Sequence, residues 1–559
     1  MKAFSVAPSI DSLSCGDSGR LARFLATFSR HVGHMFRLRN TWPSWAGVVL
    51  LATGSLSAFQ ALAPANLDEA RALIVNGDLT SASARLEEIL RNSPGNAEAL
   101  NLLGVVQAQL GDYQNAEVNF RKATAAARGS VEILLNLGRL YQENRNRDPE
   151  AAHKGIAVYE QILKLDPSHN EAVYQCAFLL GATAFYQRSL TLLSRLTGDA
   201  QQRPQILSLR LVDHAGLKNE RQVEGDIAQL LAHAELAEGD VVTILPMLFT
   251  QHNEARATRL LLGLQQRGLA SADTIEQLGL LYEQTGDLQR ARGTLEEAFQ
   301  KRASASLPLL LSLARVAYKQ RDFTGALGYL AHARELAPQD ARVHFFFGMV
   351  CIEMDLQKEA AESLKKAVQL DSENPYFNYV YGVVLIGLQG ADEGYPYLKK
   401  YCDLKPDDPR GHLVLGEAYF YAEDFGLAQK ELASAVNFPQ TSATAKLFLA
   451  RIANREEKYD EAIAKLQEAV RENPRLDDAY AELGRAYRER KDYINAKTNL
   501  LKALEINPNN SQANLNLAMV YGLTKDSRAQ EQRARVDQLE EIRRDREKKF
   551  LATIEVRPY

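Results

Sequence analysis

The sequence predicts an all-α solenoid built from about 13–14 tandem helix-turn-helix repeats. Three observations support this fold class. Helix-forming residues, chiefly Ala, Leu, Glu, Gln, Arg and Lys, dominate from Ala65 onward. Runs of alternating β-branched residues, which would indicate strands, are nearly absent. Short motifs recur every 34 residues, so the 559-residue chain is better described as one repeat array than as several globular domains.

Residues 1–62 differ from the rest, and we expect them to form an export leader. Five arginines and no acidic residue lie within residues 18–67, and an apolar stretch runs from Trp45 to Phe59. A basic segment, an apolar segment and then small residues are typical of an export signal. The apolar stretch is also nearly long enough to remain as a membrane anchor, and an Arg- and Ser-rich, acid-poor start is also found in organelle transit peptides. Met35 is a second candidate for the true start.

The repeat frame runs from residue 63 to residue 525. Its first part, residues 63–169, holds three repeats, and residues 272–525 hold regular ones. Between them, residues 170–271 lose the Gly and Tyr positions but keep the spacing, which predicts three degenerate repeats. The repeats are expected to begin near Ala63, Ala97, Val131, Asn170, Pro204, Glu238, Ala272, Leu307, Ala341, Pro375, Pro409, Ala443, Asp477 and Ser511.

Three irregular features accompany the frame. Pro246 should kink the first helix of its repeat. After an insertion at residues 144–148, Asp148 is expected to cap the following helix with Pro149 in its first position. Residues 526–559 are highly charged with a helical pattern, which favours a polar capping helix and tail over a partner-binding coiled coil. Val536, Leu539, Ile542 and Phe550 would form the inward side of that helix.

The recurring residues resemble those of the tetratricopeptide repeat family. Its units carry Leu-Gly at positions 7 and 8, Tyr at 11 and Ala at 20, a pattern matched by Leu103-Gly104 with Ala116 and by Leu483-Gly484 with Ala496. The resemblance implies a right-handed superhelix of hairpins, each made of a helix A and a helix B. Small residues at positions 8 and 20 let the two helices approach closely, and stacked hairpins share one core.

Catalysis, metal binding and nucleic-acid binding are not indicated. The net charge of −4 lacks the basic excess that is typical of nucleic-acid binding. There is no phosphate-binding loop, no HExxH motif and no Cys/His cluster at metal spacing, so we expect no catalytic residues, no metal and no cofactor. Any contact with a membrane is expected only through the N-terminal apolar segment.

The resemblance implies that partners bind to the concave face, which helix-A positions 2, 5, 9, 12 and 13, with some from 6, would line. In the repeats that start at 341, 375 and 409, these positions are apolar or aromatic. The candidate residues are Phe345, Phe346, Met349, Tyr376, Tyr379, Val383, Ile386, Leu413, Phe420 and Tyr421. Such a stripe predicts a peptide-binding groove. The alternative is that these side chains pack between neighbouring helices A.

Basic residues follow at the same positions of the next two repeats: Arg451, Arg455, Arg485 and Arg488. Like charges one helical turn apart repel each other unless they are compensated. Either Glu482 and Glu489 neutralise them, or an acidic segment of a ligand does. Partners would then be proteins or peptides, with an apolar segment and an acidic end as one form.

The sequence therefore predicts a non-catalytic scaffold or adaptor, exported to the periplasm or anchored in the cell envelope. There it would hold partner polypeptides in assembly, secretion or polysaccharide export, as the resemblance to exported members of the family implies. The alternative is a regulatory subunit of an envelope enzyme such as a glycosyltransferase or a peptidase.

Overall fold

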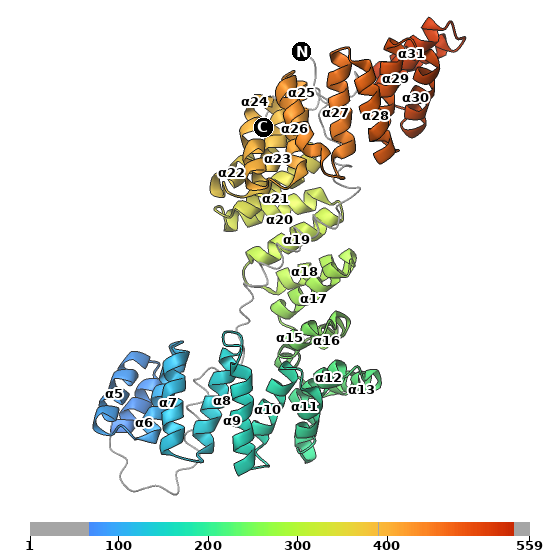
Figure 1. The fold of residues 1–559 in the computed structure, drawn as a ribbon. Helices are drawn as coiled ribbons and strands as arrows, with labels where there is room; N and C mark the ends of the chain where they lie inside the picture. Colours follow the sequence, from blue (N-terminus) through green and yellow to red (C-terminus); the bar gives the residue numbers. More distant parts are fainter. Residues whose placement is uncertain (1–65, 390, 542–559) are drawn as a thin grey trace. The chain divides into compact units, whose positions relative to one another are not determined.

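The computed structural model describes residues 66–389 and 391–541, and these residues form the 28 α-helices α4 to α31, one 3-10 helix and part of a further helix, without a strand (Figure 1). The all-α prediction is confirmed. The chain divides into two compact units, and the division falls between Gln320 and Arg321 in the sequence. No helix among the described residues is both long and apolar enough to cross a membrane.

The first unit comprises residues 66–320. Its helices are α4 (Asn66–Val75), α5 (Leu79–Asn92), α6 (Ala97–Gln109), α7 (Tyr113–Ala126), α8 (Val131–Asn144), α9 (Ala151–Leu165), α10 (Asn170–Ala182), α11 (Tyr186–Leu193), η1 (Gly198–Gln202), α12 (Pro204–Gly216), α13 (Glu220–Ala232), α14 (Glu238–Val242), α15 (Leu245–Thr250), α16 (Glu254–Gln266), α17 (Ala272–Gln284), α18 (Leu288–Lys301) and α19 (Leu307–Lys319).

The second unit comprises residues 321–541. Its helices are α20 (Phe323–Leu336), α21 (Ala341–Glu353), α22 (Gln357–Leu370), α23 (Pro375–Gln389), α24 (Ala391–Leu404), α25 (Pro409–Tyr421), α26 (Phe425–Val436), α27 (Ser442–Arg455), α28 (Tyr459–Glu472), α29 (Asp477–Glu489), α30 (Tyr493–Ile506) and α31 (Ser511–Leu523). A further helix begins at residue 529 and continues to residue 541.

Helices A begin where the 34-residue frame predicts, within one residue, from α6 to α31. The turn between helices A and B explains the recurring aspartate. In each regular repeat with such an aspartate, its carboxylate accepts the backbone N–H three residues later and caps helix B. These caps are Asp78, Asp112, Asp287, Asp322, Asp424 and Asp492. Helix B therefore starts at a residue set by local chemistry.

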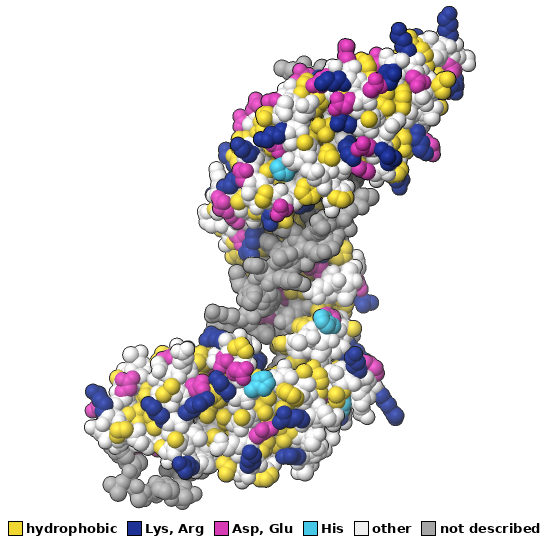
Figure 2. Space-filling view, in the orientation of Figure 1, with side chains coloured by type: hydrophobic (Ala, Val, Ile, Leu, Met, Phe, Trp, Pro, Cys, Tyr) yellow, Lys and Arg dark blue, Asp and Glu magenta, His cyan; other side chains and the backbone are white. Residues whose placement is uncertain are grey.

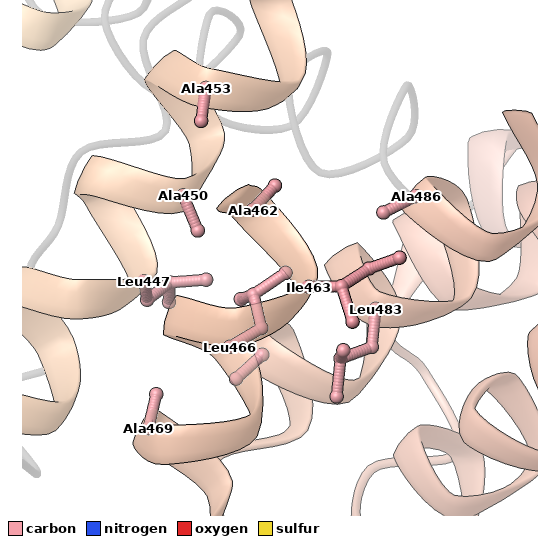
Figure 3. Packing of buried hydrophobic residues seen from close by; sticks show 10 residues of the cluster. Leu447, Ala450, Ala453, Ala462, Ile463, Leu466, Ala469, Leu483 and Ala486 are labelled. Atoms are coloured by element: carbon pink, nitrogen blue, oxygen red, sulfur yellow. The ribbon is translucent and has the colours of Figure 1, made fainter. Parts of the chain in front are cut away.

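Where position 8 is glycine, close packing of the two helices of the hairpin requires it. A Cβ added at Gly484 would lie 2.3 Å from Leu500 Cγ, and one at Gly104 would lie 2.8 Å from Phe120 Cε1. The side chain at repeat position 24, which lies on helix B, thus fills the space that a residue larger than glycine at position 8 would need. In the repeat before that of Gly484, alanines stand at the two close-contact positions, and Ala450 of α27 and Ala462 of α28 belong to one buried cluster with Leu466 (Figure 3).

The degenerate repeats keep the hairpin order but lose their local signals. None of their helices B, α11, α13 and α16, has a side-chain hydrogen bond at its N-cap. The expected kink at Pro246 is confirmed, because helix A of that repeat is broken into α14 and α15 and Pro246 lies in the first turn of α15. Repeats without caps depend more strongly on packing against their neighbours.

Asp148 does not cap α9, contrary to expectation. The helix begins at Ala151 with Glu150 as its N-cap, so Pro149 precedes it. The Asp148 carboxylate instead accepts the backbone N–H of Glu150 at 2.9 Å and pairs with Lys154 at 2.9 Å. It stabilises the turn before the helix rather than the first helical turn.

The segment after α31 packs on it through its first helical turns. The Gln532 side chain donates to Asn514 Oδ1 of α31 at 2.7 Å, and Ala529 packs against the core that contains Tyr521. Val536 and Leu539 are half-buried. Ile542, Phe550, the rest of the tail and the expected leader, residues 1–62, lie outside the described residues.

Candidate protein-binding surface

The candidate residues all lie on helices A of the second unit, namely α21, α23, α25, α27 and α29. Most aromatic side chains among them are half-buried and stack on rings of neighbouring helices. Phe345 of α21 stacks on Phe377 of α23, with ring centroids 4.6 Å apart. Tyr376 and Tyr379 lie 6.4 and 4.9 Å from the buried Tyr401 ring of α24. These rings therefore pack on one side and keep part of their surface exposed on the other.

The remaining apolar candidates also pack against the core on one side. Val383 and Ile386 pack against the core around Leu398, and Leu413 packs against the next core around Leu432. Phe346 and Met349 are also half-buried. The groove and the local-packing alternatives thus describe different sides of the same side chains.

Phe420 is the exception, because only 6% of its surface is exposed. Its ring lies 5.3 Å from that of Phe448 in α27 and 5.9 Å from that of Phe425 in α26. The expectation that Phe420 lines an open face is wrong, since α27 and the start of α26 close over it. The next residue, Tyr421, also lies near Phe448, with ring centroids 6.0 Å apart, but it is 38% exposed.

The candidate arginines are compensated within the protein. Arg451 pairs with Glu482 at 3.2 Å and Asp478 at 3.0 Å, and its guanidinium lies 5.0 Å from the Phe448 ring centroid. Glu482 also lies 3.6 Å from Arg485. These contacts favour the first of the two alternatives, in which acidic residues of the chain itself neutralise the arginines.

The other two arginines are paired as well. Arg455 pairs with Glu423 at 3.0 Å, and Arg488 pairs with Glu489 and donates to Asn516 at 2.7 Å. On the face drawn in Figure 2, basic and acidic side chains of the second unit are interspersed rather than separated by sign.

Two features of this surface were missed by the sequence reasoning. Glu417 of α25 is half-buried, and it has no hydrogen bond or ion pair among the described residues. Burial raises the pKa of its carboxyl to about 7, and Arg451 opposes that shift. The second feature is α31, where Leu515, Met519 and Leu523 are 40, 43 and 58% exposed. Glu417 and these three residues of α31 stand at repeat positions 5, 9 and 13, which were expected to face partners. Applying the same positions to every repeat would therefore have found them.

Metal ligands and thiols are two further kinds of group that could be reactive in the described part of the chain. The described residues contain no group of three or more His, Cys, Asp or Glu side chains that could hold a metal ion. Cys176, Cys351 and Cys402 are buried free thiols. Burial raises the pKa of the Cys351 thiol to about 11, which keeps it protonated and unreactive at neutral pH.

Three comparisons relate the chain to known proteins. No curated protein matches it. Similar solved structures include the APC/C hetero-tetramer Cut9-Hcn1, with 15% identity over 81% of this chain and 95% of the other and a TM-score of 0.36. They also include Naa15/Naa10 bound to HypK-THB, with 14% identity, 84% and 92% coverage and a TM-score of 0.36. Yeast Tom70 has 16% identity, 77% and 96% coverage and a TM-score of 0.33. At these values none of them bears on what this chain binds.

Family models match much of the chain. All three are described as tetratricopeptide repeat. One matches residues 67–131, 276–341, 311–375 and 413–477, the second matches 499–536 and the third matches 477–510. The matched segments together cover just over half of the chain and coincide with the regular repeats of the structure. The chain therefore belongs to the tetratricopeptide repeat family.

Proposed function

We propose that this protein is a non-catalytic scaffold that binds partner polypeptides on the helix-A surface of its second unit, in the cell envelope. The observation that carries the proposal is the half-exposed apolar surface of α21, α23 and α25. There, Tyr421 is 38% exposed on the same helix as the half-buried Glu417, which has no ion pair within residues 66–389 and 391–541. Partly exposed aromatic side chains held by packing lose little freedom on binding, which makes them good anchors for a partner.

Export to the envelope is the second element of the proposal. It is supported by the basic and apolar segments of residues 1–62. The chain would be held in the periplasm or at the membrane, where its partners act in assembly, secretion or polysaccharide export. Cell fractionation with the leader intact tests this element, and recovery in the soluble cytosolic fraction alone would contradict it.

Binding is tested by cross-linking and affinity capture from envelope fractions with the full chain. We compare the wild type with a Met349→Ala, Tyr421→Ala double variant. Leu427→Ala is the matched control, because Leu427 is 41% exposed but lies on helix B of the same repeat as Tyr421. The double variant should lose a defined set of partners that the control keeps.

Circular dichroism verifies that both variants remain folded. If the folded double variant captures the same partners as the wild type, the α21–α25 surface is not the binding site. The identity of the captured partners also separates a scaffold from a regulatory subunit, because the latter would be captured with one enzyme.

A further inference from the structure

The last helix A, α31, exposes apolar side chains at repeat positions 5, 9 and 13, and positions 5 and 9 are buried or half-buried on α21, α23, α25, α27 and α29. Leu515 stands at repeat position 5 and is 40% exposed, whereas Leu447, at the same position two repeats earlier, is 2% exposed. Met519, one turn later, is 43% exposed, and Leu523 extends the stripe by another turn. Residues four apart lie on one side of a helix, so the three form a continuous apolar strip.

The exposure of this strip follows from the repeat geometry. In earlier repeats, side chains at positions 9 and 12 of one helix A contact the next helix A: Arg451 of α27 pairs with Glu482 of α29, and Arg488 of α29 donates to Asn516 of α31. The helix that begins at residue 529 packs on α31 in the place of a helix B. Among the described residues, α31 therefore has no following helix A to cover its strip.

The margin of the strip is basic. Arg533 lies against Gly522, whose added Cβ would stand 3.4 Å from the guanidinium, and Lys525 is exposed just after Leu523. Neither cation has an ion pair among the described residues. On α29, the exposed Glu489 is already paired with Arg488. An occupant with acidic residues beside its apolar face would thus be favoured electrostatically.

Charge also distinguishes between possible occupants. Within the chain's own residues 543–549, five are basic and two are acidic, so this segment would be repelled by the basic margin. We propose that the exposed face of α31 binds an acidic amphipathic helix of a partner polypeptide, which takes the place of a next helix A. This inference rests on the proposed function and assigns a partner chemistry and a second surface to it.

The test uses the full chain and two labelled synthetic peptides in fluorescence anisotropy. Both peptides are helices with Leu at every fourth position, one with Glu and the other with Lys at the flanking positions. We expect the Glu peptide to bind saturably and the Lys peptide about tenfold more weakly or not at all. Leu515→Ser with Met519→Ser should weaken binding of the Glu peptide by about tenfold. Arg533→Glu, an exposed change that leaves the core intact, should weaken the Glu peptide selectively.

The control is Leu427→Ser with Leu501→Ser, at two leucines of the same unit that are 41 and 42% exposed on helices B. The inference is overturned if this control weakens binding as much, or if both peptides bind equally or neither binds. A further variant, Phe550→Ser with Ile554→Ser in the full chain, removes apolar side chains of the tail. The inference is also overturned if the Glu peptide binds only to this variant, because the chain's own tail then occupies the strip.

Two further measurements separate the remaining outcomes. A dimer in sedimentation velocity that disappears in the Leu515→Ser, Met519→Ser variant would make a second copy the occupant and overturn the inference. The same variant is also used in the capture from envelope fractions. If it keeps every partner that the Met349→Ala, Tyr421→Ala variant loses, and the Glu peptide does not bind, this inference fails while the proposed function stands.

Discussion

The buried carboxyl group of Asp213 should make this solenoid less stable as the pH rises. Asp213 lies on α12 in the degenerate repeats and is 1% exposed, and neither of its oxygens has a hydrogen-bond partner among the described residues. Burial raises the pKa of Asp213 to about 8, against a smaller opposing effect of the Ser189 hydroxyl. That hydroxyl donates its hydrogen bond to the Ala177 carbonyl at 3.0 Å. The carboxyl is therefore mostly protonated in the folded chain at neutral pH.

The sign and size of the effect follow from the two pKa values. An unfolded aspartate has a pKa of about 3.9, so the folded value is raised. Stability is fully present below pH 4 and is lost as the pH rises toward 8, by about 1.4 kcal/mol per pH unit. Between pH 5 and pH 7 the loss is about 2.7 kcal/mol. Asp213→Asn keeps the shape of the side chain but cannot ionise, so it should remove this slope.

Amide hydrogen exchange suits the measurement, because a repeat array opens locally rather than in one step. We would compare the opening free energies of α10 and α12 at pH 5 and pH 7, corrected for intrinsic exchange, in the wild type and Asp213→Asn. Asp199→Asn is the control, because Asp199 is exposed in the neighbouring η1. The wild type should lose more protection than Asp213→Asn, and Asp199→Asn should behave as the wild type does. Equal pH slopes in the wild type and Asp213→Asn would refute the reasoning.

Three further predictions concern packing and buried charge, each measured by thermal unfolding of the full chain. Gly484→Ala should lower the free energy of unfolding by about 1–3 kcal/mol, because the added methyl group clashes with helix B. Gly328→Ala should raise it by about 0.5–1 kcal/mol, because a Cβ at this position of α20 meets open space. Equal effects of the two substitutions would show that the hairpin is not tightly packed. Phe420→Ala should lower the free energy of unfolding by about 3–5 kcal/mol, because it leaves a cavity in the core. A loss below about 1 kcal/mol would show that the Phe420 side chain is exposed rather than buried. Arg315→Met should lower the free energy of unfolding by about 2 kcal/mol, because the buried Glu283 loses its bidentate partner. Adding Glu283→Gln should recover most of that loss, because it removes the buried charge. No recovery would mean that the effect of Arg315→Met is steric.

The repeat frame could be derived from the sequence because its signals are local. An aspartate that caps helix B acts within one turn, and a glycine at position 8 meets a side chain only 16 residues away, as Gly484 meets Leu500. The same locality explains why the start of α9 was misplaced. Asp148 and Pro149 form a sequence pattern typical of a helix start, but the turn in which they lie decided where the helix begins.

The exposure of the candidate residues could not be derived in this way. Phe420 and Tyr421 are neighbours of similar character and both rings lie near Phe448 of α27, yet the first is 6% exposed and the second 38%. Leu447 and Leu515 occupy the same repeat position, yet within the described part of the chain only Leu447 has a helix A after it. Likewise, the pairing of Arg451 with Glu482 joins side chains 31 residues apart on separate helices. The sequence by itself determined the helices, their order and the positions that face outward, because these depend on contacts within one hairpin. Only the tertiary structure decided which outward positions stay open, because the adjacent hairpin covers or exposes each of them.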